Sequence, residues 1–243
     1  MIVYLAGISS AYKSNTDLII NNKAPFLESF YSFADFEIPL INHCDFLLDS
    51  GAFTFMRGNG GAPNWDDYIE QYGNFIKTHN VKKYFELDID SVVGYEAVKK
   101  YRKKLESITG TQCIPVWHKS RGIAEYKKMC DEYPYVAIGG IVTKEIRNKD
   151  YALFTPLIDI AHKKGCKIHG LGFTSTKELS KYSFDSIDST NWLYGRYGHY
   201  YIKEGGYMHL YRRPNGKRCI QEKLQRHNLS EWIKFQKYAE ANL

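Results

Sequence analysis

Two hydrophobic patterns alternate along the chain. Short runs of β-branched and aromatic residues, typical of buried strands, are separated by longer stretches in which apolar residues recur every three or four positions, as on one face of an amphipathic helix. The short runs predict strands at residues 2–7, 46–49, 83–88, 113–118, 135–141, 166–173, 183–188 and 207–211. The periodic stretches predict helices at residues 65–79, 94–106, 121–132, 149–164, 176–182 and 230–241.

Strands that alternate with helices predict repeated βα units and a parallel sheet. Eight such units in 243 residues fit a closed (β/α)8 barrel of the TIM type, and a doubly wound open sheet is the alternative. The chain has no linker rich in proline, glycine or serine and no repeat of fixed period. We therefore expect residues 1–243 to form one α/β domain, with the loop at residues 57–64 over the catalytic face of the barrel.

Composition narrows the class of protein. Hydrophobic residues make up 44% of the chain and charged residues 25%, the balance of a globular protein. No apolar run approaches the roughly 18–20 residues of a membrane span, and the first residues lack the basic leader of a signal peptide. The five cysteines include no C-x-x-C pair, which disfavours a disulfide framework and a cysteine-rich zinc site. We expect a cytoplasmic protein with no membrane partner.

The charge balance permits a polyanionic partner without requiring one. Lys and Arg number 33 against 27 Asp and Glu, a net charge of +6. The chain also has 20 tyrosines and 13 phenylalanines, which pack in cores and, beside basic side chains, stack on nucleic-acid bases.

Polar or glycine residues stand at the end of one predicted strand after another. Asp49, Asp88 and Asp188 end three of the strands. In a barrel the carboxyl ends of the strands meet at the catalytic face. One carboxylate there commonly caps the following helix, but three at one mouth are costly to bury unless they are used or paired. The pattern therefore predicts an acidic active site.

Several carboxylates without a serine or cysteine nucleophile motif are typical of chemistry at an anomeric carbon. One class of glycosidase barrel has a D-x-D-x-E run after a strand. Asp88 and Asp90 supply its first two acids, but Val92 stands in place of the general acid. The eight histidines form no H-x-x-x-H or H-x-H pair, so we expect neither a metal nor a cofactor.

Four short motifs resemble, in order, those of the tRNA-guanine transglycosylase superfamily. Residues 45–54 (DFLLDSGAFT) are similar to its D-S-G-[GA]-[FY] strand end, and residues 136–141 (VAIGGI) to its base-binding A-[IV]-G-G-[LI] loop. Residues 170–173 (GLGF) resemble a later glycine turn. Residues 185–192 (DSIDSTNW), followed by GRYG, resemble the nucleophile segment. The similarity is greatest to the phage and bacterial branch that exchanges guanine for 7-deazaguanines in DNA.

The chain departs from the tRNA enzymes at one point. Those enzymes have a C-x-C-x-x-C…H zinc site after the nucleophile, whereas this chain has only the isolated Cys219 and His227. We therefore expect a barrel without the zinc subdomain that supports RNA binding. The absence favours DNA as the partner, with tRNA as the alternative and a free 7-deazaguanine base of the preQ0 type as co-substrate.

The resemblance implies a role for each acidic residue. Asp188 would attack C1′ of the target nucleoside and form a covalent glycosyl–enzyme intermediate, as a carboxylate nucleophile does at an anomeric centre. Asp49 would be the general acid and base for the leaving and entering bases. Asp88 would accept from N1–H and the exocyclic amine of guanine, with Asp90 nearby as a candidate for helping.

The remaining site residues follow from the same resemblance. Backbone N–H groups of Gly140 and Ile141 would donate to O6 of guanine, because glycine lets the backbone approach closely. Phe53 and Leu171 would sandwich the base, although ordinary core packing also explains them. The other base-site candidates are His118, which would contact the base substituent, Gly139 and Gly172.

A target base must leave its stack to enter such a pocket, and contacts to the phosphate backbone would offset the cost. Basic residues after strand ends and in residues 211–218 (YRRPNGKR) are the candidates, and a plain solvated turn is the alternative for the second group. They are Lys119, Arg121, Arg196, Arg212, Arg213 and Lys217.

Two further functions compete with base exchange. A barrel that binds nucleic acid without catalysis is disfavoured because both Asp49 and Asp188 are present. A metabolic barrel could use Gly139 and Gly140 to hold a phosphate. It would need a glycine-rich helix start after the seventh or eighth strand, which residues 188–190 do not supply.

Overall fold

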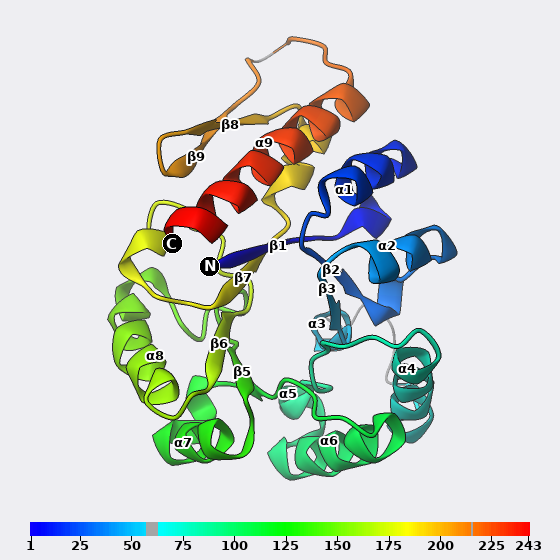
Figure 1. Cartoon of the computed structure of the whole chain (residues 1–243), viewed down its shortest axis with the longest axis vertical. Coiled ribbons are helices and arrows are strands. Elements are labelled where there is room, and N and C mark those ends of the chain that lie inside the picture. Colours follow the sequence, from blue (N-terminus) through cyan, green and yellow to red (C-terminus); the bar gives the residue numbers. More distant parts are fainter. Residues whose placement is uncertain (57–62, 215) are drawn as a thin grey trace.

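The computed structural model describes residues 1–56, 63–214 and 216–243. Its centre is one curled sheet of parallel strands in the order β3-β2-β1-β7-β6-β5-β4 (Figure 1). The strands are β1 (Ile2–Ala6), β2 (Phe26–Ser29), β3 (Phe46–Asp49), β4 (Val116–Trp117), β5 (Tyr135–Ile138), β6 (Lys167–Gly170) and β7 (Ser186–Ser189). The predicted α/β fold with a parallel sheet is confirmed.

The number of regular strands is smaller than predicted. The expected strand at residues 83–88 forms only two isolated parallel bridges, from Tyr84 to Leu48 beside β3 and from Phe85 to Ile114 just before β4. A regular ladder does not continue beyond them because the N–H of Val116 donates to the side chain of Glu86 at 2.8 Å instead of to a backbone carbonyl. The described residues therefore form a seven-stranded curled sheet, which is not a closed barrel of eight regular strands.

Two strand predictions were wrong in other ways. The short strand β2 was not predicted, although it pairs with both β1 and β3. The segment 207–211, predicted as the eighth strand of the barrel, is β9 (Tyr207–Tyr211). It pairs antiparallel with β8 (Tyr200–Glu204) in a separate hairpin. The two glycines between these strands are a hairpin signal.

Helices cover the outer face of the sheet (Figure 1). The longer ones are α4 (Trp65–Thr78), α6 (Tyr95–Thr109), α7 (Gly122–Glu132), α8 (Phe154–His162) and α9 (Gln221–Asn242). The shorter ones are α1 (Thr16–Asn22), α2 (Ile38–His43), α3 (Ala52–Met56) and α5 (Asp90–Val93). Asn64 caps α4 as its sequence position suggests, because its side chain accepts from the N–H of Asp66 at 3.1 Å.

Three helix predictions need correction. The stretch 149–164 is divided between a 3-10 segment, Asn148–Leu153, and α8. The stretch 176–182 has only the 3-10 turn Leu179–Lys181. The final helix begins at Gln221, nine residues earlier than predicted. Apart from its last two residues, the loop predicted at 57–64 lies outside the described residues.

Apolar side chains fill both sides of the curled sheet. The main core lies between the strands and the helices and extends from Val3 to Ala239. A second, smaller core consists mainly of strand residues and includes Tyr4, Leu47 and Phe85. The side chain of Gln236 ties α9 to the sheet by donating to the carbonyl of Val3 at 2.7 Å. Within the described ranges, no helix combines the length and apolar character needed to cross a membrane.

Candidate active site

A cavity of about 330 Å³ lies at the carboxyl ends of the parallel strands. Each of the seven strands contributes a lining residue at or just after this end, as expected for a site built on a curled parallel sheet. These residues include Gly7, Glu28, Asp49, His118, Gly140, Gly172 and Asp188. The strand ends highlighted by the sequence therefore meet at one place.

Most of the predicted site residues line this cavity, and three do not. Those that do are Asp49, Phe53, Asp88, His118, Gly140, Leu171, Gly172 and Asp188. Asp90, Gly139 and Ile141 are not among its lining residues. Gly139 instead makes room for a neighbour, because a Cβ atom there would lie 2.9 Å from the ring of His118.

The D-S-G turn after β3 holds the Asp49 carboxylate. The N–H of Gly51 donates to Asp49 Oδ2 at 2.9 Å. Gly51 has φ +82, and a Cβ at this position would lie 2.5 Å from that of Tyr31, so the turn requires glycine. Burial raises the pKa of Asp49 to about 6, the Gly51 hydrogen bond opposes this rise, and the nearby carboxylates of Asp188, Asp88 and Glu28 add to it. Asp49 is thus suited to exchange a proton near neutral pH.

Asp188 is the penultimate residue of β7, lines the same cavity and is 8% exposed. Its Oδ1 accepts from the N–H of Gly172 at 2.5 Å and lies 3.2 Å from Nε2 of His169. Its Oδ2 has no hydrogen-bond partner among the described residues. The carboxylate is therefore fixed through one oxygen while the other remains available.

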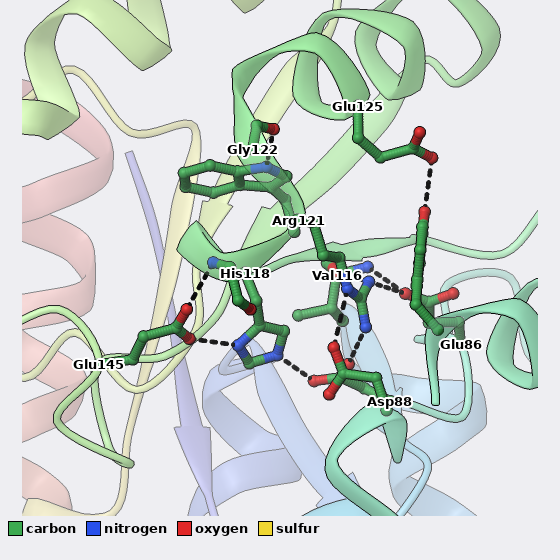
Figure 2. A network of polar contacts seen from close by, with 12 residues as sticks. Glu86, Asp88, Val116, His118, Arg121, Gly122, Glu125 and Glu145 are labelled. Atoms are coloured by element: carbon green, nitrogen blue, oxygen red, sulfur yellow. Dashed lines mark hydrogen bonds and ion pairs between the residues drawn. The ribbon is translucent and has the colours of Figure 1, made fainter. Parts of the chain in front are cut away.

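Asp88 is held in a buried polar network (Figure 2). Its carboxylate lies 2.6 Å from Nε2 of His118 and accepts from Nη2 of Arg121 at 2.7 Å. Arg121 also donates to Glu86 and to Asp90, each at 3.0 Å. With a side chain only 2% exposed, Arg121 supports Asp88 from behind and is not placed to contact a nucleic-acid backbone as predicted.

His118 is cationic at neutral pH. Burial alone would lower the pKa of His118, but the hydrogen bond and charge of Asp88, with a smaller contribution from Glu145, raise it to about 9. Its two ring nitrogens lie 2.6 Å from Asp88 and 2.9 Å from Glu145, so the imidazolium donates to both (Figure 2). Burial acts to raise the pKa of Glu145, but its hydrogen bonds with His118 and Ser120 lower the pKa overall.

Ligand atoms of Asp88, Asp90 and His118 lie within 4.8 Å of one another, which is close enough to hold a metal ion. The guanidinium of Arg121 already donates to both carboxylates, and the ring of His118 already bonds to Asp88. The positive charge that these acids need is therefore supplied by side chains of the protein.

Sequence reasoning missed several groups around the cavity. Glu28 lines it from the unpredicted strand β2 and accepts from the N–H groups of Ser9 and Ser29. Glu86 and His169 lie within segments predicted as strands, where a buried polar residue in an apolar run was the available signal. Glu145 follows the glycine loop after β5 and had no such signal.

The other predicted backbone-contact residues are exposed. Lys119 follows β4, Arg196 lies in the 3-10 segment Asn191–Tyr197 after β7, and Arg212, Arg213 and Lys217 follow β9. The segment 196–218, which we call the basic arm, has six Lys and Arg residues and one acid, Glu204. It therefore accounts for +5 of the net charge of +6 of the chain.

Compared with known proteins, the chain matches no family model and no curated sequence. The geometry of the cavity is therefore the basis for a functional proposal.

Proposed function

We propose that this protein exchanges guanine in DNA for a 7-deazaguanine base through a covalent aspartyl–glycosyl intermediate. The observation that supports this most directly is the contrast between two carboxylates on one cavity. Asp188 has an unpartnered oxygen, and the pKa of Asp49 is raised to about 6. A pair of acidic groups whose surroundings differ in this way suits a nucleophile and a proton-transfer group.

The proposed reaction has two displacements. Asp188 Oδ2 attacks C1′, the bond from C1′ to N9 of guanine breaks, and the electron pair of that bond stays with guanine. The departing base takes a proton from Asp49. The entering 7-deazaguanine then loses its N9 proton to the Asp49 carboxylate as N9 attacks C1′ and releases Asp188. Both protonation states of Asp49 are accessible near its pKa of about 6, so the exchange needs no additional acid.

Recognition of guanine would use the polar groups that the fold leaves available. Asp88, fixed by His118 and Arg121, can accept from N1–H and the amine of guanine. The backbone N–H of Gly140, which lines the cavity, has no acceptor among the described residues and can donate to O6. The N–H of Ile141 also has no acceptor there, but Ile141 does not line the cavity. Adenine has neither the N1–H nor the O6 of guanine, so it would make fewer hydrogen bonds with these groups.

The cavity wall also disfavours a phosphate ligand. Five carboxylates line it, and His118 is the one cationic side chain among the described lining residues. A phosphate placed there would be repelled, which argues against the metabolic phosphate-binding barrel. The acids are Glu28, Asp49, Glu86, Asp88 and Asp188.

We further infer that the segment at Tyr84 and Phe85 takes the place of an eighth strand in a barrel of the TIM type. Its bridges reach toward β3 on one side and β4 on the other, which are the two edges of the seven-stranded sheet. This arrangement would explain why Asp88 and Asp188 line the same cavity although they follow distant parts of the sheet.

The deciding experiment supplies labelled guanine and the purified protein with either plasmid DNA or tRNA. We expect label in DNA, none with Asp188→Asn, and normal incorporation with Asp159→Asn, an exposed aspartate on α8 that serves as the matched control. Incorporation into tRNA alone would overturn DNA as the substrate. Failure to label either nucleic acid would overturn base exchange itself.

A further inference from the structure

A chain of buried polar side chains runs from Asp188 into the sheet. His169 on β6 is fully buried, with Nε2 at 3.2 Å from Asp188 Oδ1 and Nδ1 at 2.6 Å from the hydroxyl of Ser186 on β7. The hydroxyl of Ser186 is in turn hydrogen-bonded to that of Tyr135 on β5. The reaction proposed above uses none of these three groups directly.

One assignment of protons along this chain satisfies every hydrogen bond with a neutral histidine ring. An ionised carboxylate can only accept, so Nε2 of His169 is the donor to Asp188. A neutral imidazole protonated at Nε2 accepts at Nδ1, where the Ser186 hydroxyl can donate, and Ser186 can accept from Tyr135. Every hydrogen bond is then satisfied with a neutral ring. The His169 ring also packs against the aromatic ring of Phe85, with centroids 5.2 Å apart and the rings tilted by 56°.

The chain decides which oxygen of Asp188 can react. Both partners of the carboxylate, the N–H of Gly172 and His169, bind to Oδ1. Because both hydrogen bonds are made to Oδ1, the lone pairs of Oδ2 remain free to attack C1′ of the nucleoside. A neutral donor also leaves the carboxylate more nucleophilic than a cationic partner would.

We propose that His169 is a positioning residue that holds Asp188 through Oδ1, in a neutral form protonated at Nε2, so that Oδ2 is the attacking atom. This inference rests on the proposed base exchange. The same hydrogen bond becomes stronger when Asp188 regains full negative charge as the entering base displaces it, which favours the second step.

The kinetic test compares two substitutions at one position. His169→Leu removes the donor, whereas His169→Gln places an amide donor near the position of Nε2. For His169→Leu we expect kcat for exchange to fall by about 10²-fold, the size typical of losing one preorganised donor, with KM for the base nearly unchanged. His169→Gln should recover most of the loss. His162→Gln, a more exposed histidine on α8, is the matched control.

Melting temperatures separate a folding defect from a positioning defect. Equal losses in folded His169→Leu and His169→Gln, or an effect on KM alone, would overturn the proposal. If His169→Leu does not fold, Tyr135→Phe tests the same chain from its far end. It removes the outermost donor, so we expect a smaller fall in kcat, and an unchanged kcat would overturn the directed chain.

A spectroscopic test does not depend on exchange. Nitrogen-15 NMR of histidine-labelled protein should show His169 neutral and protonated at Nε2 at neutral pH, with its Nε2 signal shifted by Asp188→Asn. A doubly protonated ring, or the Nδ1–H tautomer, would overturn the proposal whatever the activity. If the wild-type protein modifies neither DNA nor tRNA while the NMR result holds, base exchange fails and the hydrogen bond from His169 to Asp188 stands.

Discussion

Asp49 and Asp188 have the same side chain, but they differ in the pKa shift of one and in the hydrogen bonds of the other. Burial and neighbouring carboxylates raise the pKa of Asp49, whereas Asp188 is fixed by two donors at one oxygen. Both lie at strand ends on one cavity. At this scale the two acids differ in their surroundings: Asp49 is buried among other carboxylates with one donor, Gly51, whereas Asp188 has two partners, Gly172 and His169.

The two acids should fail differently when neutralised. Asp188→Asn should form no covalent adduct with guanine-containing DNA, because an amide lacks the attacking oxyanion. Asp49→Asn keeps the nucleophile, so adduct should form slowly and resolve poorly, with exchange reduced by about 10²–10⁴-fold. Denaturing electrophoresis of protein with DNA would score the shifted band. Adduct from Asp188→Asn but not from Asp49→Asn would mean that the roles are reversed.

Asp49 should also limit stability at neutral pH. Burial raises the pKa of Asp49 to about 6, above the roughly 3.9 of an unfolded aspartate, so the folded state binds this proton more tightly. Stability from this group is therefore complete below pH about 4 and is lost as pH rises through about 6. Asp49→Asn removes the penalty and still accepts from Gly51. We expect its free energy of unfolding to exceed that of wild type by about 1–3 kcal/mol at pH 7.5.

Denaturant titration at pH 4 and pH 7.5 checks this expectation. At pH 4 the two proteins should be nearly equally stable, because wild-type Asp49 is then protonated. Asp159→Asn, the exposed control, should match wild type at both pH values. A difference between Asp49→Asn and wild type that is the same at both pH values would contradict the assigned cause.

The sequence was sufficient to find those site residues that stand at the end of a recognisable strand. Acidic residues at strand ends, such as Asp88 and Asp188, were found because a strand end is visible as the end of an apolar run. Glu28 was missed together with its strand. The role of His169 depends on a partner 19 positions away, and no local pattern reports that distance.

The elements were predictable where a hydrophobic pattern is long. Helix α4 has an apolar face and a capping residue, whereas β2 is only four residues long and follows a proline. The run that became β9 has a strand pattern in either setting, and its pairing with the adjacent β8 across Gly205 and Gly206 makes it part of a hairpin. In the segment 83–88, the Glu86 carboxylate replaces a backbone acceptor, which the sequence does not reveal.

Glu86 should therefore be important for joining this segment to its neighbours. Its buried carboxylate accepts from Arg102 at 2.6 Å, from Arg121 at 3.0 Å and from the N–H of Val116 at 2.8 Å. Glu86→Gln leaves two buried guanidinium groups with less compensating charge, and we expect a loss of about 3–5 kcal/mol in the free energy of unfolding. Denaturant unfolding measures it, with the exposed Glu132→Gln as the matched control. Equal stability of the two variants would argue against this role.

Over the whole molecule, charge of opposite sign is separated in space. The cavity is lined by acids, whereas the basic arm of residues 196–218 holds +5 of the net charge of +6. A nucleic acid that presents one base to an acidic pocket needs its phosphates held elsewhere. The arm begins six positions after Thr190, a lining residue of the cavity, so the two regions are joined by a short stretch of chain.

The basic arm should consequently set the affinity for DNA and its dependence on salt. Each lost phosphate contact lowers the slope of log affinity against log salt concentration by about 1. For the double variant Arg212→Ser and Arg213→Ser we expect weaker binding at low salt and a slope smaller by about 1–2, measured by fluorescence anisotropy with a labelled duplex.

The matched control removes two exposed lysines from α7, Lys127 and Lys128, and so makes the same change in net charge. Helix α7 lies at the opposite end of the molecule from the β8–β9 hairpin (Figure 1), so this variant should bind like wild type. An equal loss in both variants would mean that net charge alone governs binding. The arm would then have no specific role, because a docking surface must lose more affinity than a distant surface that loses the same charge.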